Sequence, residues 1–206
     1  MLTPRRKSDS YHHGDLRETA VSIGLKLIQI DGPNALGIRK IAEKINVSPA
    51  ALYRHFENIE ELKVSISMQV SNDLAKLMIE KRNAVTKKAN KKSIALARLR
   101  AIGEAYIDYA RKEPKLFQIA FYCLAHPEIM KEHNYEDQSW KILFESIDEL
   151  YSVKLLKKSD FDNFSQFSWS AVHGLATLVS QGFIKPNEYQ AYKRSVLSGI
   201  ASSLSN

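Results

Sequence analysis

Residues 37–62, GIRKIAEKINVSPAALYRHFENIEEL, decide the fold of this chain. The first half carries apolar side chains at helical spacing, with charged residues between them: Ile38, Ile41, Ala42 and Ile45. This pattern then breaks, because Asn46 tolerates the left-handed conformation of a tight turn and Ser48 can cap a following helix. Pro49 suits the first position of that helix, where the missing N–H costs nothing. The stretch predicts two short helices joined by a tight turn.

The second of these helices has a distinctive outer face. Leu52 and Phe56 are spaced to be buried, which leaves small side chains and then Tyr-Arg-His facing outward: Ala50, Ala51, Tyr53, Arg54 and His55. A short helix with small residues at its start suits the DNA major groove, so we interpret the pair as a helix-turn-helix. Any small helical hairpin shows apolar residues at this spacing, and that alternative accounts for Ile41, Ile45 and Leu52. It explains the exposed Tyr-Arg-His triplet less well.

The same segment resembles the DNA-binding domain of the TetR (TetR/AcrR) family of transcriptional regulators. The matching letters are Ile41-Ala42, Val47-Ser48, Ala51 through Phe56, and Glu61-Leu62. Upstream, residues 15–30 show helical apolar spacing and stop at the Asp-Gly-Pro of residues 31–33, which also fits. Three positions depart from the family pattern. Asn46 replaces a turn glycine, Gly37 replaces a Thr or Ser that contacts phosphate, and Ile59 replaces a lysine.

The resemblance implies that Tyr53 and His55 contact phosphates while Ala50 and Arg54 face bases. Lys63, one turn beyond the absent lysine, would replace that phosphate contact. The full set of expected DNA-binding residues is Arg39, Ser48, Pro49, Ala50, Tyr53, Arg54, His55 and Lys63.

The composition fits this interpretation. The 206 residues are 44% hydrophobic and 26% charged, which is ordinary for a globular protein, and the net charge of +7 favours an anionic partner such as nucleic acid. Cys123 is the single cysteine, so no intramolecular disulfide can form. The N-terminus lacks the apolar core of a secretory signal, and no apolar run is long enough to span a membrane. We therefore expect a cytoplasmic protein without membrane contact.

The pattern along the chain predicts an all-α fold of about nine helices in four parts. They are a flexible basic arm (1–13), a helix-turn-helix domain (14–58), a connecting helix (59–86) and a C-terminal ligand-binding and dimerisation domain (87–206). The basic residues of the arm either follow the DNA backbone or belong to a solvated tail: Arg5, Arg6 and Lys7. Helix breakers stand at Pro33, Pro114, Pro127 and Pro186.

Residues 164–183, FSQFSWSAVHGLATLVSQGF, contain the Trp169, His173 and Gly174 that match the Trp-His-Gly class of C-terminal domain within the family. Small residues among apolar ones permit close approach of another helix, and in this family the last two long helices pair with their symmetry mates. The expected homodimer interface is Phe167, Ala171, Gly174, Leu175, Leu178, Tyr192, Val196 and Ile200. The alternative is that these faces close the core of a single chain.

A second face of the same helix, together with aromatic side chains upstream, predicts an internal pocket for a small effector. Such pockets are mostly apolar with a few polar groups, and His173 is a candidate polar group. The expected lining residues are Tyr106, Tyr109, Phe117, Phe121, Trp169 and His173. The alternative is that the aromatic stripe is core and that His173 is a hydrogen-bonded core histidine.

Catalysis finds little support in the sequence. Cys123 and His126 lack an orienting partner, His12-His13 with Asp15 resembles a metal cluster only superficially, and no phosphate loop or HExxH-type pair occurs. We expect no enzyme, no cofactor and no metal. The predicted function is a ligand-responsive repressor that binds double-stranded DNA at a near-palindromic operator as a homodimer. The alternatives are a helical protein-binding module and a regulator without a small ligand.

Overall fold

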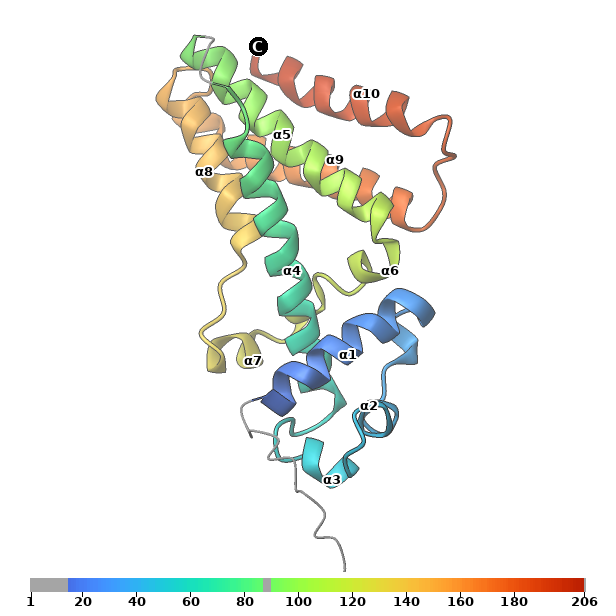
Figure 1. The fold of residues 1–206 in the computed structure, drawn as a ribbon. Coiled ribbons are helices and arrows are strands. Elements are labelled where there is room, and N and C mark those ends of the chain that lie inside the picture. The colour runs from blue at the N-terminus through green and yellow to red at the C-terminus, as the bar shows by residue number, and fades with distance from the viewer. Residues whose placement is uncertain (1–14, 87–89, 206) are drawn as a thin grey trace, which may run out of the picture.

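The computed structural model describes residues 15–86 and 90–205, and within them every regular element is helical (Figure 1). The ten α-helices are α1 (Asp15–Asp31), α2 (Ile38–Lys44), α3 (Pro49–Leu52), α4 (Ile59–Asn83), α5 (Lys91–Lys112), α6 (Pro114–Phe117), α7 (Pro127–Glu132), α8 (Gln138–Ser152), α9 (Phe161–Ser180) and α10 (Tyr189–Ser202). The all-α prediction is confirmed, with one helix more than the expected nine. The predicted basic arm, residues 1–13, lies outside the described residues.

Local signals in the sequence set the helix boundaries. Pro49, Pro114 and Pro127 each occupy the start of a helix, as their missing N–H groups allow. Asn58 caps α4 by accepting a hydrogen bond from the Glu61 N–H at 3.0 Å. In a capping box the Glu61 carboxylate would accept the N–H of the cap residue Asn58. Here it accepts the N–H of Glu57, one residue earlier.

Helices α1, α2 and α3 form a compact head around the start of α4. Their core includes the fully buried Ile41, Leu52, Phe56 and Ile66. Helix α1 approaches α4 closely at Gly24, where a Cβ atom would lie 2.4 Å from Cδ1 of Ile66.

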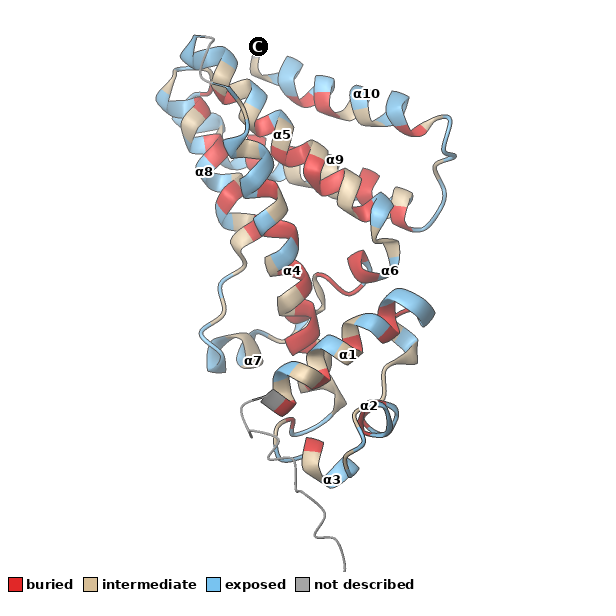
Figure 2. Cartoon of the chain, viewed as in Figure 1, coloured by how far each residue is buried: buried red, intermediate tan, exposed pale blue. Residues whose placement is uncertain are grey.

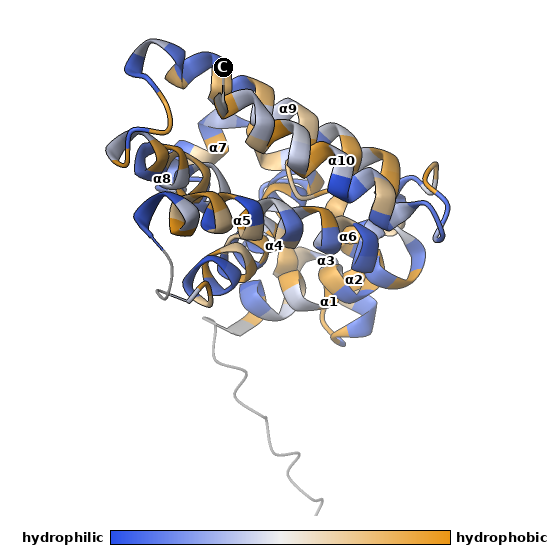
Figure 3. Ribbon diagram, turned by 90° about the horizontal axis from the view of Figure 1, so that it is seen from above, coloured by the Kyte–Doolittle hydropathy of each residue, from blue (hydrophilic) through white to orange (hydrophobic). Residues whose placement is uncertain are grey.

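The remaining helices form the body, whose core gathers on α5, α8, α9 and α10 (Figure 2). At the end of the body far from the head, Glu149 of α8 accepts hydrogen bonds from Arg82 of α4 at 3.3 Å and Arg98 of α5 at 2.5 Å. One half-buried carboxylate thus joins three helices. Helices α9 and α10 lie side by side along one flank of the body (Figure 3).

Helix α4 runs from the head into the body, and the segment after α6 fastens to it. The buried Ser67 hydroxyl donates to the Ala120 carbonyl at 3.1 Å and accepts the Cys123 N–H at 2.9 Å. Tyr109 and Phe121 pack against both the head core and the body core. The two parts are therefore in direct contact beyond the connecting helix itself. No helix in the described part of the chain is long and apolar enough to cross a membrane.

Candidate DNA-binding surface and ligand pocket

The turn between α2 and α3 has the predicted geometry. Asn46 adopts a positive φ of 57°, the left-handed conformation that asparagine tolerates. Ser48 caps α3, because its Oγ accepts the Ala51 N–H at 3.2 Å. Helix α3 itself is short, and the chain continues in turns through Tyr53 and Arg54.

The outer face of this segment is open. Ser48, Pro49, Ala50, Tyr53 and Arg54 are all exposed, and Tyr53 keeps 53% of its surface in solvent. Arg39 of α2 is also exposed, whereas His55 is half-buried. The head thus presents an aromatic hydroxyl and a guanidinium beside small side chains, the arrangement expected of a surface that enters a groove of DNA.

A network centred on Arg17 of α1 holds the end of this segment in place. Its guanidinium donates to the His55 carbonyl, to Glu61 at 3.1 Å and to Ser65 at 2.8 Å, the last two on α4. It also lies 4.5 Å from the centre of the Phe56 ring and contacts His133, just beyond α7, at 3.3 Å. Sequence reasoning missed Arg17, since its partners lie 38 to 116 residues away in the chain.

Lys63 does not join the open surface. Its Nζ pairs with Glu60 at 3.0 Å and lies 5.6 Å from the centre of the Tyr122 ring, so its charge is engaged within the protein. The Tyr122 hydroxyl donates to the same Glu60 carboxylate, and this bond together with the lysine lowers the Glu60 pKa. Of the expected DNA-binding residues Lys63 is thus the one whose charge already has partners within the protein, and its phosphate contact stays a prediction.

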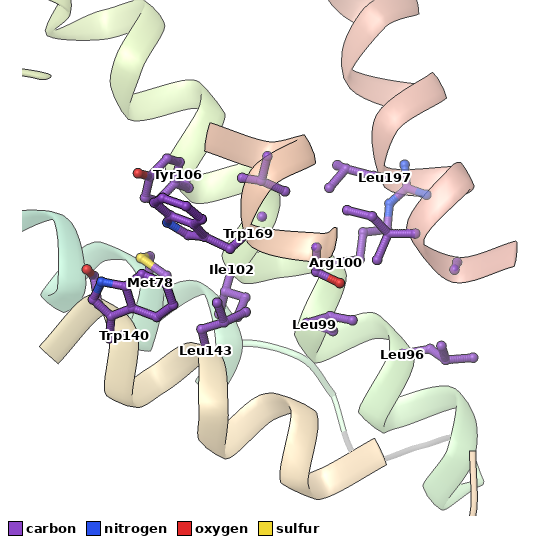
Figure 4. A pocket seen from close by; sticks show the side chains of 16 residues that line it. Met78, Leu96, Leu99, Arg100, Ile102, Tyr106, Trp140, Leu143, Trp169 and Leu197 are labelled. Atoms are coloured by element: carbon purple, nitrogen blue, oxygen red, sulfur yellow. The ribbon is translucent and has the colours of Figure 1, made fainter. Parts of the chain in front are cut away.

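The body contains a cavity of about 60 Å³ between α4, α5, α8, α9 and α10 (Figure 4). Its wall is largely apolar: Met78, Leu96, Leu99, Ile102, Gly103, Leu143, Val172, Leu197, Ile200 and Ala201. The rings of Trp140 and Trp169 lie on one side, with centroids 5.0 Å apart, and Tyr106 lies next to them. The other lining residues are Arg100, Ser139 and Ser168.

Only two of the six expected ligand residues, Tyr106 and Trp169, line this cavity. Phe117, Phe121 and His173 instead pack around Tyr106 as a neighbouring aromatic cluster, with ring centroids 5.4 to 6.2 Å from its ring. Tyr109 lines an external groove between α4 and α5. These four residues therefore lie outside the cavity wall, and their contact with a ligand stays a prediction.

His173 bonds to the Tyr106 hydroxyl through its Nδ1 atom at 2.8 Å. Burial lowers the pKa of His173, and burial also raises the pKa of Tyr106 well above its ordinary value. Both shifts favour the neutral forms, so the hydrogen bond joins an uncharged hydroxyl and an uncharged imidazole. His173 is thus a partly buried histidine whose Nδ1 has a hydrogen-bond partner within the protein.

Comparison with known families agrees with this geometry in both parts of the chain. Residues 21–66 match the family described as bacterial regulatory proteins, tetR family, and residues 99–200 match the tetracyclin repressor-like C-terminal domain. The chain belongs to the TetR family. It is therefore a DNA-binding transcriptional regulator of the helix-turn-helix type, a class of protein that is not enzymatic.

Individual relatives of this TetR-family chain are distant. It is 23% identical over 107 residues to the uncharacterized HTH-type transcriptional regulator YobS of Bacillus subtilis (strain 168), a match that spans 52% of each chain. Among solved structures it is similar to a tetR-family regulatory protein from Rhodococcus RHA1, with 18% identity, a TM-score of 0.61 and coverage of 92% and 95%. RolR, solved in complex with the ligand resorcinol, shows 13% identity, a TM-score of 0.61 and coverage of 94% and 93%. At these identities the structural likeness establishes the fold.

The expected interface residues of this TetR-family protein divide into two groups. Phe167, Leu178 and Tyr192 point outward with 42% to 48% of their surface exposed, and a Cβ atom on Gly174 would meet nothing within 4 Å. Leu175 and Ile200 are only 4% exposed because they pack into the body core, and Ala171 and Val196 pack partly against the same core. The chain itself covers Leu175 and Ile200 in this conformation, so Phe167, Leu178 and Tyr192 are the members of the predicted interface that remain open to a partner.

Proposed function

We propose that this TetR-family regulator is a repressor that binds a near-palindromic operator as a homodimer and is released by a small, mainly apolar or aromatic molecule. Operator binding is supported by the exposed surface at the start and end of α3. Pro49 and Ala50 leave room for the groove, while Tyr53 and Arg54 supply a phosphate contact and a base contact. The cytoplasm, where such a protein meets DNA, is its proposed location.

The DNA contacts are tested by a pair of variants with a matched control. Tyr53→Ala should weaken binding to all duplexes alike, whereas Arg54→Ala should reduce the preference for the operator by about 1–3 kcal/mol. Lys157→Ala removes an equally exposed positive charge from the loop after α8 and should change neither quantity. Fluorescence anisotropy on operator and random duplexes measures both. If Tyr53→Ala and Arg54→Ala bind as Lys157→Ala does, the surface is misassigned.

A homodimer is supported by the outward apolar residues of α9 and α10. Phe167, Leu178 and Tyr192 are large, about half exposed, and lie on the two helices that run side by side along the flank of the body (Figure 3). Gly174 and Gly199 leave the helix surface open to close approach, because a Cβ atom at either would meet nothing within 4 Å. Burying such a face against a second copy would remove apolar surface from water.

The effector site is supported by the apolar cavity beside Trp140 and Trp169. A cavity of about 60 Å³ is smaller than the roughly 150 Å³ that admits benzene in an engineered protein core. A ring-sized ligand must therefore displace the surrounding helices as it enters. The resorcinol complex of RolR supports the idea that a protein of this fold accommodates a small aromatic molecule.

The displacement of the helices around the cavity can be transmitted to the head. Tyr106 lines the cavity and packs on Phe117 and Phe121, and Ala120 between them bonds to Ser67 of α4. If the ligand binds the DNA-binding conformation and the released conformation with different affinity, it would shift α4 and with it the separation of the two heads of the dimer. Coupling of about 1–3 kcal/mol would weaken DNA binding roughly 5- to 150-fold.

A thermal-shift screen followed by DNA-binding anisotropy tests the effector. Compounds that stabilise the protein should change the fluorescence of Trp140 and Trp169, which both line the cavity, and should release DNA. If stabilising compounds leave both signals unchanged, the regulator acts without a ligand in this cavity. If no duplex binds in a salt-sensitive way, a protein-binding module becomes the better description.

A further inference from the structure

The cavity wall contains one polar atom that the protein leaves unpaired. Ser168 of α9 is 3% exposed, and its Oγ is buried without a hydrogen-bond partner. A buried hydroxyl without a partner is unfavourable, because it loses its hydrogen bonds to water and gains none in return. The residue lines the cavity, so its hydroxyl lies beside the space that a bound molecule would occupy.

The other buried serines in the described helices are hydrogen-bonded. Ser65, Ser146 and Ser165 each donate to the carbonyl four residues earlier, at 2.7 to 2.9 Å, which is the usual solution for serine within a helix. Ser139, the other serine of the wall, donates to Asp137 at 2.5 Å. Ser168 is therefore the free hydroxyl of the described cavity wall.

The charges of the wall restrict what can occupy the cavity. Arg100 is the single charged residue among those that line it. Its side chain is 46% exposed, at the rim of the cavity, and it pairs with Glu104 at 2.8 Å. A charged group carried past this rim would enter apolar surroundings without a counterion, which is costly. The rings of Trp140, Trp169 and Tyr106 instead offer flat surfaces against which an uncharged ring can pack.

We infer that the effector is an uncharged molecule with a ring-sized apolar body and a hydroxyl or carbonyl oxygen that hydrogen-bonds to Ser168. This inference rests on the proposed function, since it specifies the ligand of the proposed effector cavity. Ser168 gives selectivity: a ligand that carries the oxygen satisfies the unpaired hydroxyl, whereas a pure hydrocarbon of the same shape leaves it unpaired.

The test compares two probes that differ in one hydroxyl, 3-methylphenol and toluene, by ligand-observed NMR titration against the full chain. The variant is Ser168→Ala, and the matched control is Ser165→Ala, one turn earlier on α9, whose hydroxyl already bonds within the helix. The preference of wild type for 3-methylphenol over toluene should fall about 2- to 12-fold in Ser168→Ala, the value of one net hydrogen bond. The preference should be unchanged in Ser165→Ala.

Two further measurements accompany the titration. Benzoate should bind at least tenfold more weakly than 3-methylphenol, because its charge finds no partner inside the cavity. Ser168→Ala should melt at the same temperature as wild type or higher, since it removes an unpaired group, whereas Ser165→Ala should melt lower.

An equal preference in wild type and Ser168→Ala, the absence of 3-methylphenol binding to wild type, or benzoate binding as tight as that of the phenol would each overturn the inference. A lower melting temperature for Ser168→Ala than for Ser165→Ala would do the same, since it would show that the protein satisfies the hydroxyl. The proposed function is tested separately, by measuring DNA binding with anisotropy. The inference about the ligand and the proposed function can therefore fail independently.

Discussion

Replacing Arg17 by methionine should destabilise the head and loosen the DNA-binding surface. The change keeps an apolar stem of similar length and removes the guanidinium, and with it the contacts to the His55 carbonyl, Glu61 and Ser65. Hydrogen bonds to charged groups contribute about 1.5–3 kcal/mol each when buried, and the cation–π contact with Phe56 adds about 0.5–1 kcal/mol.

These contributions are not additive, and the Arg17 side chain is 30% exposed, so solvent screens part of them. We therefore expect a total loss of about 2–3 kcal/mol in the free energy of unfolding. For a chain of this size the melting temperature should fall by about 4–12 °C. DNA affinity should fall as well, because the carbonyl that ends the recognition segment loses its anchor.

The matched control is Lys76→Ala on α4, which removes an ion pair with Asp73 at 3.3 Å whose lysine side chain is 73% exposed. Surface pairs of this kind contribute about 0–1 kcal/mol, so the control should stay close to wild type. Urea denaturation followed by circular dichroism measures both variants. If Arg17→Met loses no more stability than Lys76→Ala, the network does not hold the head together.

Three further predictions concern the body. Burial lowers the folded-state pKa of His173 below its ordinary 6.5, so the unfolded chain binds more protons at this residue. The free energy of unfolding should therefore fall as the pH drops below about 6.5, by at most about 1.4 kcal/mol per pH unit. Melting curves of His173→Gln, recorded over the same pH range, should lack this dependence on pH. Leu178→Arg should give folded monomers by sedimentation and circular dichroism, whereas Leu175→Arg should unfold the chain, and a folded dimer of Leu178→Arg would place the interface elsewhere. A Cβ atom on Gly103 would lie 2.8 Å from Cδ2 of Leu197, the far end of a flexible side chain, so Gly103→Ala should displace the Leu197 side chain, change the cavity wall and weaken 3-methylphenol binding without unfolding the chain; unchanged binding would show that the cavity wall yields freely.

Local chemistry in the sequence predicts the head well. The turn at Asn46 and the cap at Ser48 each depend on neighbouring residues, so each could be predicted from the sequence and each is confirmed. The exposure of Tyr53 follows from the same periodicity.

Features that depend on the packing of distant segments could not be predicted in this way. Helix α9 has apolar residues around most of its circumference, so spacing alone could not decide whether Leu175 faces its own core or a partner. Lys63 was assigned to DNA from its position one turn along α4, but Tyr122 and Glu60 engage it from the tertiary fold. The unpaired Ser168 looks like any helical serine in the sequence, because only the folded wall shows that its hydroxyl has no partner.

The two heads of a dimer should recognise one DNA sequence through α3 and the residues that follow it. This is tested by selection of genomic fragments bound by the purified wild-type chain, followed by footprinting of the enriched fragments. We expect a near-palindromic site with two protected half-sites about one helical turn, or 34–36 Å, apart, whose protection is lost in Tyr53→Ala. Enrichment of no sequence, or equal protection by wild type and Tyr53→Ala, would contradict it.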